Sequence, residues 1–387
     1  MAREELERAR AALRDAGVDL AVLAAPANIC YLAGVDVPLP IDSGWETSEG
    51  QVLIVLSVTD GQGVLLWPDA WLPLLGTPLL QDVRPFPTLN MDHAVNGTEA
   101  FLAILEMALE DKGLRRGVVV GIEPRCLSER VAALLRDHDA QPRLIDATAA
   151  LDKARRRKTS REIALIRRAV AAADAGQDAL TALCRGEAVG MSEVDLFTRV
   201  YAAVHQEANG PVPIVGELVS GPRTGIVSYP GGPRARVVRR GDTVIQDISV
   251  RVAGYWADCT NTLVVADDPT PEQRRYWMAA RRALDACVEA LQPGATAGSV
   301  AAAARRSFAM DGFRVTPYCG HQIGAAVNEP PRLLEYDQTV IEEGMVFAVE
   351  PGVYGGAETG LGARAERVVV VRADGPDILS RFSWAID

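Results

Sequence analysis

The chain has 387 residues, of which 48% are hydrophobic and 24% are charged, and its formal net charge is −11. This length predicts two domains, and the acidic balance argues against binding to nucleic acid or to an anionic membrane surface. The sequence contains no apolar run of about 18 residues, which argues against a membrane-spanning helix. The charged N-terminus is not typical of a signal peptide, so we expect a cytoplasmic protein.

The first 150 residues alternate between helical and strand patterns. We predict helices over 3–16, 99–112 and 128–138, and strands over 18–25, 51–58, 63–67 and 118–123. This alternation is typical of an α/β domain. These 150 residues contain no glycine-rich phosphate loop and no obvious catalytic cluster. The six cysteines are scattered without a CxxC pair and predict buried thiols.

A basic run over residues 153–158 ends this first part, and we interpret it as a solvated linker face. Thr159 and Glu162 then have the spacing of a capping box, which predicts a long helix to about residue 183. Further helices are predicted over 192–205, 270–291 and 298–310. Strands between these helices predict an α+β domain with helices on one face of an antiparallel sheet. The predicted domains are residues 1–152 and 158–387.

One frame occurs twice in the second half of the chain. Gly241 and Gly344 each begin an apolar strand, and a carboxylate follows each glycine by six positions. A returning strand in each segment carries a second carboxylate. The four carboxylates are Asp247, Asp258, Glu350 and Glu366. Singly, each is more often a turn or cap residue than a metal ligand, but the repeated frame favours a shared site.

The spacing of the first pair has a geometric meaning. Asp247 and Asp258 are symmetric about a four-residue loop over 251–254, which predicts that they are directly opposed on antiparallel strands. Opposed Cβ atoms lie about 4.5–5.5 Å apart, so the two carboxylates repel unless a cation lies between them. With His321 the carboxylates form an oxygen-rich ligand set that suits two divalent ions. Manganese is the first choice, and iron, cobalt and zinc are alternatives.

These stretches resemble, in order and spacing across residues 158–387, the M24 metallopeptidases, which include aminopeptidase P, prolidase, methionine aminopeptidase and creatinase. The resembling stretches are Lys158–Ile163, Ser220–Pro222, Gly254–Asp258, Gly320–Gly324, Gly344–Phe347, Glu350–Tyr354 and Gly362–Glu366. Residues Pro26–Gly34 also resemble the N-terminal domain of the creatinase type.

The resemblance implies a pita-bread catalytic domain after a smaller α/β domain, usually in a homodimer. It implies that Asp258, His321 and Glu366 hold one metal, that Asp247 binds the second, and that Asp258 and Glu366 bridge the two. Glu350 would be a ligand and a proton shuttle. By the same resemblance, Arg364 would orient the neighbouring carboxylate or bind a carboxylate of the substrate. Tyr354, which follows Glu350-Pro351-Gly352, either donates a hydrogen bond in the pocket or closes a turn.

Peptidases of this family carry two substrate-binding histidines that this chain lacks. One position falls in the stretch with Ser228 and Tyr229, which we expect to cover it, and the other is Asn328. The amide of Asn328 can donate a hydrogen bond but cannot protonate a leaving group near neutral pH.

Three functions therefore stay open. The first is hydrolysis of a peptide or amide C–N bond, as in Xaa-Pro peptidases, by hydroxide held on two metals. The second is chemistry on a non-peptide small molecule, as in creatinase, ectoine hydrolase or dimethylsulfoniopropionate lyase. In that case Arg223, Arg234 and Arg236 would recognise an anionic group, and the alternative is that they are solvated arginines at strand ends. The third is a binding module without catalysis.

Overall fold

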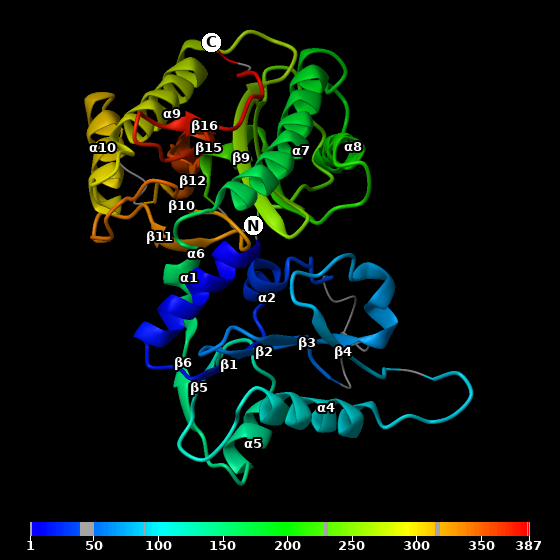
Figure 1. The fold of residues 1–387 in the computed structure, drawn as a ribbon. Coiled ribbons are helices and arrows are strands. Elements are labelled where there is room, and N and C mark those ends of the chain that lie inside the picture. Colours follow the sequence, from blue (N-terminus) through cyan, green and yellow to red (C-terminus); the bar gives the residue numbers. More distant parts are fainter. Residues whose placement is uncertain are drawn as a thin grey trace. The chain divides into compact units, whose positions relative to one another are not determined.

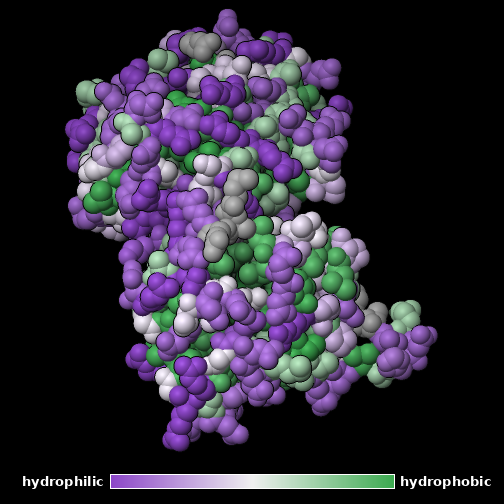
Figure 2. Space-filling model, in the orientation of Figure 1, coloured by the Kyte–Doolittle hydropathy of each residue, from purple (hydrophilic) through white to green (hydrophobic). Residues whose placement is uncertain are grey.

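The computed structural model describes residues 2–38, 50–88, 90–227, 231–313, 318–384 and 386. Its chain divides into two compact units, Met1–Arg156 and Arg157–Asp387, which Figure 1 shows as ribbons and Figure 2 as a space-filling view coloured by hydropathy. No helix in these described ranges is long and apolar enough to cross a membrane.

The first unit is built around a mixed sheet of six strands in the order β4-β3-β2-β1-β5-β6. Its strands are β1 Leu20–Leu23, β2 Leu53–Ser57, β3 Gly63–Pro68, β4 Asp82–Phe86, β5 Val119–Ile122 and β6 Arg143–Asp146. Its helices are α1 Ala2–Asp15, α2 Pro26–Ala33, η1 Asp69–Leu74, α4 Gly97–Asp111, α5 Glu129–Asp137 and α6 Thr148–Arg155. Every strand and helix predicted for this part is present, within a few residues.

Helices cover both faces of this sheet. Ala21 and Leu23 of β1 belong to the core under α1, α2 and α6, whereas Leu20 and Val22 belong to the core under α4 and α5. Figure 1 shows these two layers of helices on opposite sides of the strands. Strands buried on both faces alternate between two apolar cores, which explains their uninterrupted hydrophobic runs.

The second unit contains three antiparallel sheets, with strand orders β7-β8-β9, β11-β10-β12-β15-β16 and β13-β14. Its helices are α7 Ser160–Arg185, α8 Glu193–Glu207, η2 Gly221–Gly225, α9 Pro271–Ala290, α10 Ala297–Met310 and α11 Gly356–Thr359. Its strands are β7 Ile214–Ser220, β8 Thr243–Val252, β9 Tyr255–Val264, β10 Gly320–Gln322, β11 Glu329–Arg332, β12 Val346–Val349, β13 Gly352–Tyr354, β14 Gly362–Arg364, β15 Arg367–Val370 and β16 Asp377–Ile378.

The predicted capping box at the start of α7 is confirmed, since Thr159 accepts a bond from the Glu162 amide and Glu162 accepts one from the Thr159 amide. Helix α7 packs along β8 and β9, where Gln177 donates hydrogen bonds to two strand carbonyls, those of residues 246 and 259. Helices α9 and α10 cover a separate core behind β12 and β15. In Figure 1 the helices lie outside these strands, which leaves the inner strand faces for a site.

The register of β8 and β9 differs from the prediction. Asp247 is opposite Thr260, and Asp258 is opposite Ser249, so the two aspartates are not directly opposed. The hairpin turns through two residues, Ala253 at φ 50° and Gly254, also at positive φ, instead of four. Two-residue loops with positive φ at both positions match the twist of paired strands. The shift amounts to two positions, so both aspartates stay on one face.

The basic run at 153–158 is a solvated face only in part: Lys153 and Arg157 are exposed as predicted, but for two other cations the prediction was wrong. Arg155 and Lys158 are 5% and 4% exposed. Arg155 ends α6 and pairs with Asp152, while the Lys158 ammonium lies 3.0 Å from Glu329. Each buried cation is stabilised by a carboxylate. The partner of Lys158 is distant in sequence, and the partner of Arg155 lies one turn earlier in the same helix.

Asp174 of α7 makes folding stability depend on pH. Its Oδ2 accepts a bond of 2.6 Å from the backbone amide of Arg381, and burial raises its pKa from 3.8 to about 6. The folded state therefore holds this proton more tightly than the unfolded chain does. Its stabilising contribution is fully present below about pH 3.8 and is lost as the pH rises through about 6.

We expect the variant Asp174→Asn, which keeps an acceptor oxygen, to raise the free energy of unfolding at pH 7 by about 1–2 kcal/mol. The change at pH 4 should be much smaller, because wild-type Asp174 is then already protonated. Urea denaturation at both pH values checks this, and an equal effect at the two values contradicts it.

Candidate metal centre

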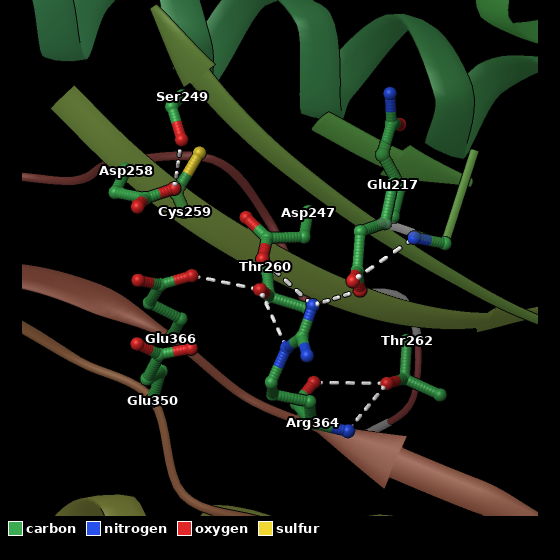
Figure 3. Close-up of polar contacts among 12 residues, drawn as sticks. Glu217, Asp247, Ser249, Asp258, Cys259, Thr260, Thr262, Glu350, Arg364 and Glu366 are labelled. Carbon is green, nitrogen blue, oxygen red and sulfur yellow. Dashed lines mark hydrogen bonds and ion pairs between the residues drawn. The ribbon is translucent and has the colours of Figure 1, made fainter. Parts of the chain in front are cut away.

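The five residues expected to bind metal converge on the inner face of the second unit. Asp247 lies on β8, Asp258 on β9 and His321 on β10. Glu350 directly follows β12 and Glu366 directly precedes β15, and these two strands pair in antiparallel fashion. Figure 3 shows the four carboxylates pointing toward one another from these elements. We call Asp247, Asp258, Glu350 and Glu366 the carboxylate cluster.

Distances within the cluster suit shared cations. One carboxylate oxygen from each of Asp247, Glu350 and Glu366 lies within 4.8 Å of the others. His321 Nε2 lies 3.6 Å from Asp258 Oδ2 and 3.5 Å from Glu350 Oε1. Its Nδ1 lies 2.9 Å from the carbonyl of Gln322 and donates there, so Nε2 carries the lone pair of the neutral imidazole and donates to the carboxylates when the ring is protonated.

Electrostatics of the cluster favour cation binding. Burial, followed by the charge of Asp258, raises the pKa of Asp247 and of Glu366 well above the usual range. Burial also raises the pKa of Glu350. Burial alone lowers the pKa of His321, but contact with Asp258 and Glu350 outweighs it and the pKa is raised. A group of carboxylates that resist ionisation together becomes stable as anions when divalent cations are bound.

Two acceptor atoms support the fit directly. Asp247 Oδ1 and Glu366 Oε1 are buried and accept no hydrogen bond from any residue that the structure describes. The second oxygens of both groups are bonded, to Arg364 and Thr260 respectively. Buried polar atoms normally have partners. Oxygen atoms held in this way, with an imidazole nitrogen beside them, are the donor set that divalent Mn, Fe or Co prefers.

Arg364 lies against the cluster and contacts four side chains. Its Nη2 donates to Asp247 at 2.7 Å and to Glu217 at 2.8 Å. Its Nε donates to Thr260 at 3.1 Å and its Nη1 to the Tyr354 hydroxyl at 3.2 Å. Of the two roles left open for Arg364, the geometry favours orienting a carboxylate. The Tyr354 hydroxyl accepts the bond from Arg364 through its oxygen and keeps its own hydrogen for donation.

A pocket of about 420 Å³ opens onto the cluster. Besides three cluster members, His321 and Arg364, its wall contains Val215, Gly216, Glu217, Val227, Ser249, Trp256, Tyr318, Val327 and Asn328. Asn328 is exposed at this wall and accepts a bond of 3.3 Å from the Tyr318 hydroxyl, which leaves its amide donors for a ligand. The apolar members make part of the pocket wall hydrophobic.

The remaining predicted substrate residues are not in this pocket as described. Ser228 and Tyr229 fall outside the described residues. Arg223 is not in the pocket wall, because its guanidinium pairs with the buried carboxylate of Glu193 and donates to the carbonyl of Gly232. Arg236 pairs with Asp242 at 2.8 Å. The charges of these two arginines are therefore balanced inside the protein, and neither is retained for an anionic substrate.

Sequence reasoning missed three polar residues of the pocket wall. They are Glu217, Ser249, whose hydroxyl donates to Asp258 at 3.0 Å, and Tyr318. Ser249 follows Asp247 by two positions, so the alternation of β8 was a usable signal. No local sequence pattern identified Glu217 or Tyr318. Each is brought to the site by the tertiary fold, Glu217 through the pairing of β7 with β8 and Tyr318 through its place just before β10.

A buried ion pair lies beneath β10. The Lys158 ammonium is fully buried and donates to Glu329 Oε2 at 3.0 Å and to the Gln322 side chain. Its backbone amide donates to the carbonyl of Gly344. Gln322 adjoins His321, and Gly344 begins the strand that leads to Glu350. Lys158 therefore ties together the segments that carry two of the expected ligands.

Comparison with known proteins gives two family matches along the chain. The profile of metallopeptidase family M24 matches residues 164–373. The profile of the creatinase/prolidase N-terminal domain matches residues 5–157. Together these matches cover both units of the structure.

Individual proteins are similar over part or all of the chain. A putative dipeptidase, YkvY, from Bacillus subtilis is 27% identical over 72% of this chain and 75% of its own length. An Xaa-Pro dipeptidase from Pyrococcus furiosus is 34% identical over 37% of this chain and 41% of its own. The crystal structure of the dipeptidase PepE from Mycobacterium ulcerans is 25% identical and covers 100% of this chain and 97% of that one, with a TM-score of 0.78. These similarities confirm the predicted fold class, an α/β N-terminal domain of the creatinase type followed by a pita-bread α+β domain.

Proposed function

Because the chain belongs to metallopeptidase family M24, we propose that this metallohydrolase cleaves the peptide or amide C–N bond of short Xaa-Pro substrates. The observation that carries the proposal is the convergence of four carboxylates and one imidazole on a pocket, with acceptor atoms of Asp247 and Glu366 unpartnered among the described residues. Relatives named as Xaa-Pro dipeptidases support the substrate class.

The residues that would hold the metal ions are the carboxylate cluster and His321. Two divalent ions, when bound, polarise a substrate carbonyl and lower the pKa of a water that attacks it. The protein's contribution is to fix the ligands before binding. Thr260 donates to Glu366 at 2.7 Å, and Arg364 holds Asp247, so two carboxylates are already oriented.

Proton transfer is assigned to Glu350, which lines the pocket and carries a raised pKa. Its carboxylate would accept a proton from the attacking water and deliver it to the leaving nitrogen. Asn328 would donate an amide hydrogen bond to the substrate carbonyl or to the oxyanion that develops there. The apolar wall formed by Val215, Val227 and Trp256 would receive a proline ring or a similar apolar group.

Finer parts of the proposal are manganese as the metal, two ions per chain, a homodimer and a cytoplasmic location. Metal analysis of purified protein and light scattering check the first three of these. Retained metal at about two ions per chain also separates a catalytic protein from a pure binding module.

The proposed activity predicts turnover of a panel of Xaa-Pro di- and tripeptides by manganese-reconstituted protein. Cleavage should be absent from the variant Glu366→Gln and retained in Glu343→Gln, which changes an exposed glutamate of the same unit. If protein carrying two metals cleaves no member of the panel, the peptidase assignment is wrong. A non-peptide small molecule then becomes the expected substrate.

A further inference from the structure

A row of polar side chains crosses the three strands beside the metal centre. Glu217 on β7 is the register partner of Asp247 on β8, and Asp247 is the partner of Thr260 on β9. Side chains of register partners share one face of a sheet. Glu217 thereby brings a fourth carboxylate to the pocket wall, although it was not expected among the ligands. Figure 3 shows it beside Asp247, with the Arg364 guanidinium reaching both carboxylates.

Glu217 is held firmly in this position. The residue is 9% exposed, and its Oε2 accepts the 2.8 Å bond from Arg364. Its Oε1 accepts a bond of 3.3 Å from the backbone amide of Gly231. Both oxygens are used by the protein, so Glu217 has a fixed orientation and a fixed cationic partner.

Arg364 has little capacity left for a ligand. A guanidinium carries five N–H donors, and four of them point to Glu217, Asp247, Thr260 and Tyr354. Apart from His321, Arg364 is the only basic residue in the described pocket wall. Two dications would balance the four carboxylates of the cluster, and Glu217 balances Arg364. The described wall therefore offers no uncompensated positive charge to a substrate.

We propose that Glu217 determines specificity by excluding a free carboxylate from this side of the pocket. The preferred substrates are peptides or amides whose group beside Glu217 is uncharged or cationic, such as a C-terminal amide or a continuing peptide chain. A dipeptide with a free C-terminal carboxylate would meet the like charge of Glu217 and a guanidinium that is already occupied. This inference rests on the proposed peptidase function and narrows its substrate class.

The test compares wild-type and Glu217→Gln protein, both reconstituted with manganese, on alanyl-proline and alanyl-prolinamide. Glutamine keeps one acceptor oxygen for Arg364 and removes the charge, while its amide nitrogen replaces the oxygen that accepts the weaker, 3.3 Å bond from Gly231. We expect wild-type protein to cleave the amide with the higher kcat/KM. The variant should shift the ratio of kcat/KM values toward the free acid by at least about tenfold, because the like charge is gone and the charge of Arg364 is no longer balanced by Glu217.

Calorimetric titration with L-proline and L-prolinamide provides a readout that does not require catalysis. The variant should gain affinity for proline and keep its affinity for prolinamide. Glu187→Gln, which alters an exposed glutamate of the same unit, should behave as wild type in both measurements.

The outcomes separate the two proposals. If wild-type protein cleaves either substrate but the acid-to-amide ratio is the same in Glu217→Gln, the role of Glu217 is wrong and the peptidase function stands. If neither substrate is cleaved, the peptidase function fails on this pair and calorimetry decides the role of Glu217. In that case, the proposed role of Glu217 is wrong if the variant binds proline no more tightly than wild-type protein does.

Discussion

The variant Glu366→Gln is expected to lose more than about 100-fold in affinity for divalent metal, since even residues that only support a ligand contribute about 10–100-fold. Glu366 is fully buried, and one of its oxygens, Oε1, has no partner among the described residues. Glutamine can still accept the bond from Thr260, but it has no negative charge with which to bind a metal cation. Metal affinity can be measured by competition with a chelating dye.

The same variant should raise the thermal stability of the metal-free protein. Burial and neighbouring carboxylates raise the pKa of Glu366, so its ionised form is costly in the folded state near neutral pH. Removing that charge relieves the repulsion when no cation is present. Differential scanning calorimetry with and without manganese checks both effects, with Glu343→Gln as the control. A variant that keeps wild-type metal affinity would show that Glu366 is not a ligand.

The second large effect is expected for Lys158→Met, which should lower the free energy of unfolding by about 3–5 kcal/mol. Lys158 is fully buried at its ammonium group and lies 3.0 Å from the buried carboxylate of Glu329. Methionine fills a similar volume but leaves Glu329 without this ammonium. Breaking one side of a buried ion pair costs more than the pair contributes, because the other charge stays in a medium of low dielectric constant.

A double variant tests that explanation. Adding Glu329→Gln to Lys158→Met removes the remaining charge and should recover most of the lost stability. Lys153→Met, at an exposed position, should be close to wild type in urea denaturation. If the double variant is no more stable than Lys158→Met alone, the loss comes from packing and not from the uncompensated charge.

Local chemistry explains which elements the sequence predicted well. The start of α7 follows from the capping box of Thr159 and Glu162, and the start of α9 follows from Thr270 and Pro271. These signals depend on residues within one helical turn. The edge strands β4 and β6 of the first sheet were missed because they are partly exposed and carry charged residues, which removes the apolar pattern of a strand.

The β8–β9 hairpin shows how a correct conclusion can follow from a wrong register. A four-residue loop was the simpler prediction, since alanine seldom adopts the left-handed conformation that Ala253 has. The true register is displaced by two positions, and side chains alternate with a period of two. Asp247 and Asp258 therefore remain on the same face, and the argument for a cation between carboxylates survives. A displacement by one position would have placed the two aspartates on opposite faces of the sheet and removed that argument.

The sequence by itself determined the family, the order of the helices and the set of acidic and imidazole side chains available for metal, because residue type, motif order and capping are properties of the chain. Only the tertiary structure decided which charges meet. Arg223, expected at the substrate, pairs with Glu193, and Glu217 reaches Arg364 across 147 positions of the chain. Ion pairs of this kind leave no periodic pattern in sequence, because their partners are brought together by strand pairing and packing and not by local propensity.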